Sequence, residues 1–256
     1  MGELHLSTTG KAPLDVASKI VVSAGQILMR RFNGPKEVSS KGINGPVTDV
    51  DVQVESYIID RLMVEYPYDG FLAEESNPTI GTSGYTWIID PLDGTRNYVM
   101  GIPFFSLVIA LAYRGEVVLG VTYDPVRKEM FHALRDEGSY LNNVPIQIPR
   151  EKRMGNILLG YDLGGLNQGA HSAIEMILHL LPQLQSTRMF GSAALGLAYI
   201  SCGRLDIYFH NNLSVWDAAS GILLVSEAGG VVTDKHNKSG GLIEGAIVAG
   251  SPSLHQ

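Results

Sequence analysis

The chain has 256 residues, of which 45% are apolar and 18% are charged, and 26 acidic against 19 basic residues give a formal net charge of −7. This composition is typical of a globular protein, and the absence of a lysine or arginine run disfavours a protein that binds a nucleic-acid backbone. No apolar stretch approaches the roughly 18 residues that a membrane span needs. The N-terminus lacks the apolar core of a secretory signal and Cys202 is the only cysteine, so we expect a cytoplasmic protein without disulfides.

The first part of the chain, residues 1–150, is expected to form an α+β half. Apolar residues recur at helical spacing over residues 13–31 and 51–65, and the second pattern stops before a proline. From residue 71 to residue 134, short strand-like runs alternate with glycine and proline turns. This pattern predicts a mostly antiparallel sheet.

The second part, residues 151–256, reads as strand and helix in alternation. At roughly 150 residues per domain, the chain is either one large domain or two closely packed halves. No polar linker separates the two parts, so we expect the functional site at their interface. The predicted strands span 157–161, 186–190, 205–209, 231–233 and 246–250, and the predicted helices span 168–181, 192–201 and 215–227.

Acidic residues are concentrated in one stretch of the chain. Between residues 49 and 93 there are ten acids and a single base, Arg61. A solvated face of a helix or loop is the ordinary place for such charges. We assign four of these acids to the surface: Asp49, Asp60, Glu65 and Asp69.

Two other acids of this stretch follow apolar runs. Glu74 follows FLA and Asp90 follows TWII, so each carboxylate is expected where a buried strand meets a loop. Burying an unpaired carboxylate is costly unless a proton, a cationic side chain or a metal compensates. Because bases are scarce here and neither His nor Cys is near, the pattern favours Mg²⁺, with Mn²⁺ as an alternative, over zinc.

The segment WIIDPLDGTRNY, residues 87–98, combines the features of a metal site and a phosphate site. Its proline forces a turn after Asp90, and Asp93 returns a second carboxylate three residues later. The carbonyl of Leu92, between them, can point at the same ion. Gly94 and Thr95 then begin a short helix or turn whose backbone N–H groups can hold an anion.

Five motifs, in order along almost the whole chain, resemble the inositol monophosphatase family of Mg²⁺-dependent, lithium-sensitive phosphatases. The pairing of DPLDGT with a distant WDAAS is the most specific part of the resemblance. It implies a layered αβαβα sandwich of the α+β class, a homodimer, and a small-molecule phosphate ester as substrate. The motifs are GPVTDVD (45–51), FLAEES (71–76), IDPLDGTRNY (89–98), GSAAL (191–195) and WDAAS (216–220).

The resemblance also implies the metal ligands. A first Mg²⁺ would be held by Glu74, Asp90 and the carbonyl of Leu92. A second would be held by Asp90, Asp93 and Asp217, and a third, weaker ion would lie near Glu74.

The catalytic pair follows from the same resemblance. Thr95 and Asp51 would orient and deprotonate a metal-activated water, which attacks phosphorus in line without a covalent phosphoenzyme. The alternative for Asp51 is an N-cap of the 51–65 helix, and the two roles are compatible; for Thr95 it is a simple turn residue. Glu75 lies beside a ligand and is expected to support the ligands rather than to bind an ion.

Candidate substrate contacts are Asp93, Gly94, Thr95, Gly191, Ser192, Ala193 and His210. The alternative for Ser192 is a helix cap. Inositol-preferring members carry an acid where this chain has His210, which could accept one hydrogen bond when neutral or attract a second phosphate when protonated. This departure weakens the inositol assignment and favours fructose 1,6-bisphosphate, histidinol phosphate or 3′-phosphoadenosine 5′-phosphate as alternatives. Inositol monophosphate stays the first substrate that the family resemblance implies.

Three other interpretations of the acidic motifs fit the sequence less well. The D-x-D-x-T box of haloacid-dehalogenase-type phosphatases does not fit, because Asp90 and Asp93 are three residues apart and Asp49 follows a loop. An EF-hand starting at Asp49 fails because its sixth position is Val54 instead of glycine. A non-enzymatic metal-dependent binding protein on the same scaffold stays open.

Overall fold

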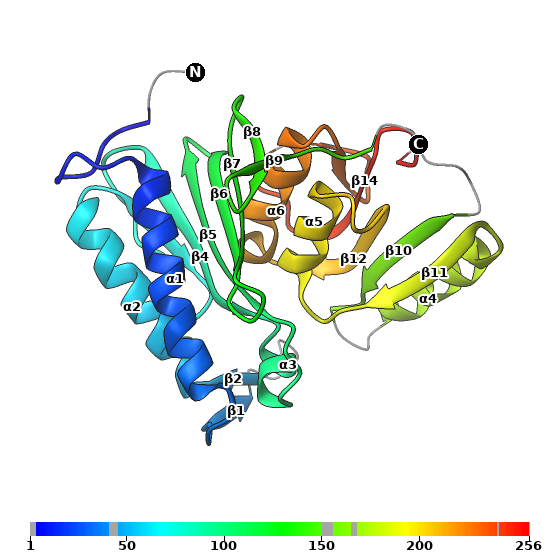
Figure 1. Ribbon diagram of the computed structural model, residues 1–256, viewed down its shortest axis with the longest axis horizontal. Helices are drawn as coiled ribbons and strands as arrows, with labels where there is room; N and C mark the ends of the chain where they lie inside the picture. Colours follow the sequence, from blue (N-terminus) through cyan, green and yellow to red (C-terminus); the bar gives the residue numbers. More distant parts are fainter. Residues whose placement is uncertain (1–3, 41–45, 150–155, 165–167, 240, 256) are drawn as a thin grey trace.

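The computed structural model describes residues 4–40, 46–149, 156–164, 168–239 and 241–255. Over these residues the chain forms five layers in the order helix, sheet, helix, sheet, helix (Figure 1). The predicted α+β class and αβαβα sandwich are confirmed. The predicted boundary between residues 150 and 151 lies outside the described residues, so the division into halves stays a proposal. Among the described residues, no helix combines the length and apolar character that a membrane crossing requires.

The first two layers come from the N-terminal part of the chain. Helices α1 (Pro13–Phe32) and α2 (Asp49–Glu65) cover one face of a seven-stranded sheet in the order β3-β4-β5-β6-β7-β8-β9. Its strand pairs are antiparallel except β3 with β4, which is parallel, so the prediction of a mostly antiparallel sheet is confirmed. The strands are β3 (Gly70–Ala73), β4 (Tyr85–Asp93), β5 (Ser106–Tyr113), β6 (Glu116–Asp124), β7 (Glu129–Leu134), β8 (Gly138–Leu141) and β9 (Val144–Ile146).

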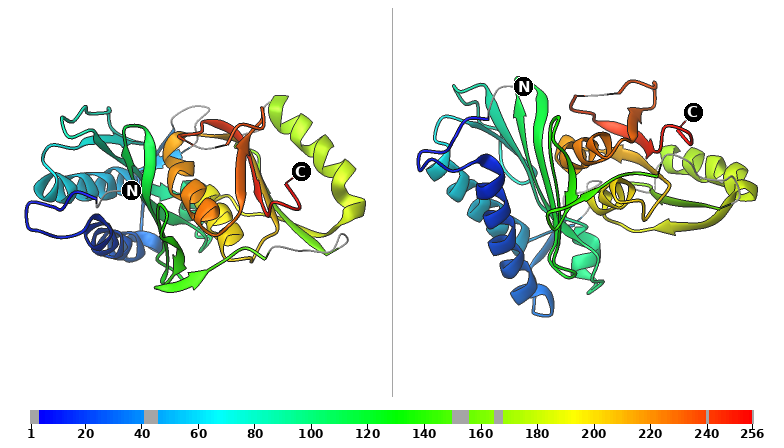
Figure 2. Two further views of the ribbon diagram at one scale, coloured as in Figure 1. Left: turned by 90° about the horizontal axis from the view of Figure 1, so that it is seen from above. Right: turned by 45° about the horizontal axis from the view of Figure 1, so that its top comes forward.

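The remaining layers come mostly from the C-terminal part. Helices α5 (Ala193–Ser201) and α6 (Val215–Glu227) lie between the two sheets, and α4 (Gln168–Leu180) packs on the outer face of the second (Figure 2). That sheet has the order β11-β10-β12-β14-β13. Its strands are β10 (Ile157–Asp162), β11 (Leu184–Met189), β12 (Ile207–Leu213), β13 (Val231–Asp234) and β14 (Gly245–Gly250), and the short elements are β1 (Val38–Ser40), β2 (Pro46–Thr48), α3 (Thr95–Val99) and the 3₁₀ turn η2 (Leu181–Gln183).

The strand and helix alternation predicted for this part is present, but the sheet is mixed. Strand β10 runs parallel to both β11 and β12. Strand β14 runs antiparallel to β12 and β13. The last two strands are joined without a helix, which accounts for the change of direction.

Strand β5 shows why the central layers need such apolar sequence. Every residue from Ser106 to Ala112 is buried, because α1 and α2 cover one face of the strand and α5 and α6 cover the other. A strand covered on both faces reads as a continuous apolar run instead of an alternating one. Helices α5 and α6 are apolar around most of their circumference for the same reason.

The expectation that Asp69 lies on a solvated surface is wrong. Its side chain is only 1% exposed and lies 3.0 Å from His5 Nε2. It also accepts hydrogen bonds from Ser83 Oγ at 2.7 Å and from the indole N–H of Trp87 at 3.0 Å. The N-terminal segment covers this acid through a contact between residues 64 positions apart, which the sequence pattern around Asp69 does not reveal.

The other three acids assigned to the surface are less buried. Asp60 is exposed, and Asp49 pairs with Arg31 at 2.7 Å. Glu65 is largely covered by a pairing with Lys11 at 2.5 Å, and this hydrogen bond lowers the pKa of Glu65 to about 2.

Replacement of Asp69 by alanine is expected to lower the free energy of unfolding by about 2–4 kcal/mol, because it leaves the buried N–H of Trp87 without an acceptor. Chemical denaturation followed by tryptophan fluorescence measures this change. Asp60→Ala is the matched control and should stay within about 0.5 kcal/mol of wild type. Equal stability of the two variants would contradict a buried role for Asp69.

Candidate active site

Three carboxylates from two distant stretches of the chain, strand β4 and helix α6, meet between the first sheet and α6. The expectation of a turn after Asp90 is wrong: strand β4 continues to Asp93, with a shift of its pairing register with β5 between Asp90 and Asp93. Asp217 lies in the first turn of α6. One oxygen of each carboxylate lies within 4.8 Å of the others. We call these three residues the acidic cluster.

The acidic cluster is strongly desolvated. Asp90 is 1% exposed and Asp93 is 7% exposed. Burial raises the pKa of Asp90 well above its usual range, and the charges of neighbouring carboxylates, with Glu74 first, raise it further. Burial likewise raises the pKa of Asp93 to about 6 and that of Asp217 to about 7.

One atom of this cluster tests whether a metal fits. Asp90 Oδ1 accepts the backbone N–H of Leu92 at 2.9 Å, whereas Asp90 Oδ2 is buried and has no hydrogen-bond donor among the described residues. A buried carboxylate oxygen without a donor, next to two further carboxylates, is the arrangement that a divalent cation satisfies. Oxygen-only ligands suit Mg²⁺ or Mn²⁺.

Glu74 and Glu75 follow β3 at the edge of this cluster. Glu74 is not one of the three carboxylates whose oxygens lie within 4.8 Å of one another, but its charge raises the pKa of both Asp90 and Asp217. The backbone N–H of Glu75 donates to Glu55 Oε2 at 2.8 Å, and Glu55 is 3% exposed in α2. Sequence reasoning missed Glu55, although its position next to Val54 on the buried face of α2 is an unusual place for an acid.

Asp51 and Thr95 contact each other directly. Thr95 Oγ1 lies 3.1 Å from Asp51 Oδ1 and 3.0 Å from the carbonyl oxygen of Leu92, so its single proton can go to either. The expectation that Asp51 is an N-cap needs correction: α2 begins at Asp49, and Thr48 is the N-cap. Asp51 is the third helical residue and accepts from the Thr48 backbone N–H and hydroxyl in a capping box. Asp51 therefore supports the N-terminus of α2 from the third helical position and also faces Thr95.

Asp93 lies against the N-terminus of α5. Its carboxylate accepts from the hydroxyl of Ser192, from the backbone N–H groups of Ala193 at 3.0 Å and Ala194 at 3.1 Å, and from Ser106 Oγ at 3.1 Å. Ser192 is the N-cap residue of α5, but its side chain makes no cap hydrogen bond. The GSAAL segment thus holds Asp93, whereas the helix-cap alternative for the Ser192 side chain is wrong.

Two polar side chains that sequence reasoning missed hold the chain before α5. Asp162 Oδ1 accepts the backbone N–H groups of Phe190 at 3.2 Å and Gly191 at 2.7 Å. Asn97 Nδ2 donates to the carbonyl oxygens of Phe104 and Phe190, both at 2.8 Å. Asn97 is part of the DPLDGTRNY motif. Nothing in the sequence indicates that its side chain binds Phe190, in the other part of the chain.

The turn between Asp93 and Thr95 depends on glycine. Gly94 has a φ of +93°, and a Cβ there would lie 3.1 Å from the carbonyl oxygen of Gly191. Helix α3 begins at Thr95, as predicted. Gly94 and Thr95, the predicted phosphate-binding turn, therefore lie beside Gly191, the first residue of the predicted substrate segment GSAAL.

His210 is a buried, neutral side chain on β12. It is 6% exposed, and burial lowers its pKa to about 4. Its Nδ1 accepts the backbone N–H of Asn212 at 3.1 Å, which assigns the proton to Nε2. His210 thus offers a hydrogen-bond donor, in contrast to the acceptor expected from the sequence, and it is uncharged at neutral pH.

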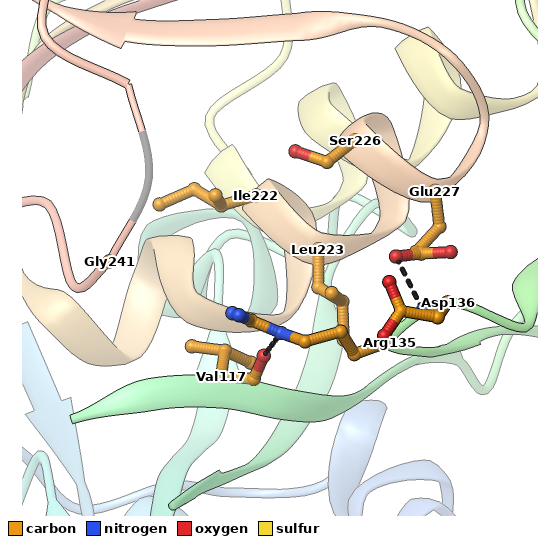
Figure 3. A pocket seen from close by; sticks show the side chains of 8 residues that line it. All are labelled: Val117, Arg135, Asp136, Ile222, Leu223, Ser226, Glu227 and Gly241. Atoms are coloured by element: carbon orange, nitrogen blue, oxygen red, sulfur yellow. Dashed lines mark hydrogen bonds between the residues drawn. The ribbon is translucent and has the colours of Figure 1, made fainter. Parts of the chain in front are cut away.

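A separate hollow of about 220 Å³ lies at the other end of α6 (Figure 3). Arg135 Nε donates to the carbonyl oxygen of Val117 at its base, and Glu227 accepts the backbone N–H of Asp136. Glu227 is ten residues from Asp217 along α6, or about 15 Å. The hollow contains none of the predicted site residues; it is lined by Val117, Arg135, Asp136, Ile222, Leu223, Ser226, Glu227 and Gly241.

In metal-free buffer, Asp90→Asn is expected to raise the melting temperature, because an uncharged amide removes the repulsion within the acidic cluster. Mg²⁺ at about 100 times its Kd should stabilise wild type by about 2.7 kcal/mol and the variant far less. Thermal denaturation with chelator and with Mg²⁺ measures both effects, and Asp60→Asn serves as control. A metal-free variant that melts below wild type would refute the repulsion argument.

His210→Gln is expected to reduce the loss of stability on acidification. The pKa of His210 is about 4 in the folded protein against 6.5 for the ordinary side chain, so the unfolded chain binds the extra proton between these pH values. Stability therefore falls as the pH drops from 6.5 towards 4, by about 2–3 kcal/mol at pH 4.5. Urea denaturation at pH 7 and 4.5 should show a smaller difference for the variant, and the exposed His236→Gln should behave like wild type.

Comparison with known proteins places this site in a family. Residues 12–256 match the model of the inositol monophosphatase family. The chain is 37% identical over 246 residues to the Nus factor SuhB of Salmonella typhimurium, covering 94% of this chain and 92% of that protein. It is also 37% identical over 247 residues to the inositol-1-monophosphatase of Rhizobium meliloti, covering 95% and 93%.

Solved structures agree with the sequence comparison. The extragenic suppressor protein suhB of Bartonella henselae superposes with a TM-score of 0.90 at 35% identity, over 94% of each chain. The IMPase of Thermotoga maritima superposes with a TM-score of 0.86 at 29% identity, over 94% of this chain and 93% of that one. The chain therefore belongs to the inositol monophosphatase family, a family of metal-dependent phosphatases.

Proposed function

We propose that this phosphatase is a Mg²⁺-dependent phosphomonoester hydrolase for small polyol phosphates, with inositol monophosphate as its first substrate. The observation that carries the proposal is the acidic cluster, in which Asp90 Oδ2 is buried without a donor among the described residues. The Thr95–Asp51 contact lies beside it. Family membership favours this enzyme over a non-enzymatic metal-binding protein.

The metal ligands are assigned by their place in the site. Glu74, Asp90 and the carbonyl of Leu92 would hold one Mg²⁺, and the acidic cluster would hold a second. The family resemblance implies a third, weaker ion near Glu74. Mn²⁺ could take the same oxygen ligands. When bound, the ions neutralise phosphate charge and lower the pKa of a coordinated water.

The chain's own residues then handle the proton. Thr95 donates its hydroxyl proton to Asp51, which leaves the lone pairs of Oγ1 free to accept a proton from an attacking water. Burial raises the pKa of Asp51 above its usual range, which makes this carboxylate a better proton acceptor. The Thr48 cap fixes its orientation, so alignment needs little reorganisation.

The substrate would lie between the two parts of the chain. Asp93, Gly94 and Thr95 would face its phosphate, and Gly191, Ser192 and Ala193 would face its ring. The Nε2–H of His210 would donate to a ring oxygen, which suits a neutral polyol. Glu75 would support the ligands through its backbone bond to Glu55.

The remaining expectations complete the proposal. We place the protein in the cytoplasm, which its lone cysteine favours. A homodimer is favoured by β11, an edge strand, and by the exposed Ile174 and Leu178 on α4. Some relatives are named Nus factors, but the net charge of −7 argues against a nucleic-acid polymer as partner here.

A phosphate-release assay tests the function. Inositol 1-phosphate, fructose 1,6-bisphosphate, histidinol phosphate and 3′-phosphoadenosine 5′-phosphate are compared with Mg²⁺, with Mn²⁺ and with chelator. Turnover is expected with a divalent ion only, fastest on inositol 1-phosphate, and inhibited by Li⁺. A different preferred ester would correct the substrate, and inactivity on all four esters with both ions would refute the hydrolase.

Thr95→Val is expected to lower kcat by about 10²–10⁴-fold, the usual contribution of a positioned proton acceptor. Valine keeps the shape of threonine but removes the hydroxyl that contacts Asp51. Thr95→Ser retains the hydroxyl and should stay within about tenfold of wild type. Mg²⁺ binding by calorimetry should be similar in the three proteins, and equal kcat values for the valine and serine variants would contradict the proton path.

A further inference from the structure

The acidic cluster is complete only if α6 packs at the correct place on the first sheet. Asp90 and Asp93 belong to β4, whereas Asp217 is carried by α6, which packs on the sheet face opposite α1 and α2 (Figure 1). An error in the position of α6 would therefore change the separation between Asp217 and the other two carboxylates. Some contact must fix this helix to the sheet.

Gly120 of β6 provides an unusually close contact. A Cβ at this position would lie 2.9 Å from Ser220 Cα and 3.0 Å from the Ser220 carbonyl oxygen. These are backbone atoms of α6, so no side-chain rotation could relieve the overlap. Gly120 pairs with Ala110 on β5 and with Ala133 on β7, and these small neighbours extend the surface on which α6 rests.

A buried hydrogen bond accompanies this packing. The hydroxyls of Thr122 and Ser220 lie 2.9 Å apart, and both residues are fully buried. Ser220 follows Asp217 by one helical turn. Each hydroxyl can satisfy the other, so this bond defines one position of the helix along the strand.

The strand register connects this contact to the acidic cluster. Thr122 pairs with Val108, and Val108 pairs with Asp90. Directly paired residues project to the same face of a sheet, so Thr122 and Asp90 share the face that α6 covers. Their backbones are two strand spacings apart, about 10 Å. The Thr122–Ser220 contact therefore lies at the same position along the strands as Asp90, two strands away.

The other side of α6 is packed just as closely. A Cβ on Gly221 would lie 2.5 Å from Leu197 Cδ1 of α5. Helix α5 lies beside α6 in the layer between the two sheets, so α6 cannot shift sideways towards α5 without displacing it. The N-terminus of α5 in turn holds Asp93.

We propose that Gly120, Thr122 and Ser220 are positioning residues for the metal site, because they fix α6 where Asp217 completes the acidic cluster. This inference rests on the metal binding in the proposed function. It adds to that function three residues that touch neither metal nor substrate and yet set the affinity for Mg²⁺.

Isothermal calorimetry with Mg²⁺ alone tests the inference on the full chain without substrate. Gly120→Ala is expected to weaken Mg²⁺ binding by about tenfold or more, the range over which residues behind metal ligands control affinity. Thr122→Val introduces no overlap with the α6 backbone, keeps the fold, and should weaken binding in the same direction. Thr122→Ser retains the hydroxyl and should restore wild-type affinity.

Gly25→Ala is the matched control. Gly25 lies on α1, and a Cβ there would lie 2.8 Å from Tyr123 Cε1, on the same strand as Gly120. Tyr123 belongs to the core on the α1 side of the sheet, so this variant disturbs packing on the other face. A thermal melt of each metal-free variant records the loss of stability, and Gly25→Ala should bind Mg²⁺ like wild type even where its melting temperature falls.

The outcomes separate the two proposals. Wild-type protein that binds no Mg²⁺ would overturn the proposed function. Wild-type binding together with unchanged affinity in both Gly120→Ala and Thr122→Val would overturn only the positioning inference. Equal weakening by Gly25→Ala would also overturn it, because general loosening of the fold would then explain the effect.

Discussion

Repulsion among closely spaced carboxylates, two of them buried, is the constraint on which this structure depends. Asp90, Asp93 and Asp217 place oxygen atoms within 4.8 Å of one another, in surroundings that raise the pKa of each. Such a cluster opposes folding until a cation or a proton is supplied. The neighbouring chain partly offsets this cost, because the serine hydroxyls and α5 N–H groups around Asp93 favour its charged form.

The five-layer arrangement is what allows the acids to meet. Helices α5 and α6 belong to the cores of both sheets, so the two parts of the chain share one set of packed side chains. A shared helical layer resists relative movement, since any displacement opens voids on two faces at once. The acidic cluster therefore gains its precise geometry from apolar packing, and its carboxylate oxygens are ligands of the kind that suit Mg²⁺ or Mn²⁺.

Much of this could be predicted from the sequence because its signals are local. The helices and most strands follow from periodicity and from proline and glycine, and the motif pair DPLDGT and WDAAS identifies the family. The proline after Asp90 marks an irregularity of strand β4 and not the predicted turn. Burial of Asp69 under His5, support by Glu55 and Asp162, and the tautomer of His210 could not be predicted. Each of these features depends on a contact between residues far apart in the chain or on a single backbone hydrogen bond. Interactions of these two kinds produce no periodic pattern in the sequence.

The small residues around α6 show most clearly what could not be predicted from the sequence. In the sequence, Gly120 interrupts an apolar strand, where glycine ordinarily weakens the sheet. In the structure it admits the backbone of α6, and the space it leaves is filled by Ser220. Gly120 weakens the strand locally, but it allows α6 to approach the sheet more closely than a larger residue at this position would permit. The WDAAS motif lies in the first two turns of that helix and carries Asp217. Gly120, which has no side chain, thus helps to bring the three carboxylates of the acidic cluster together.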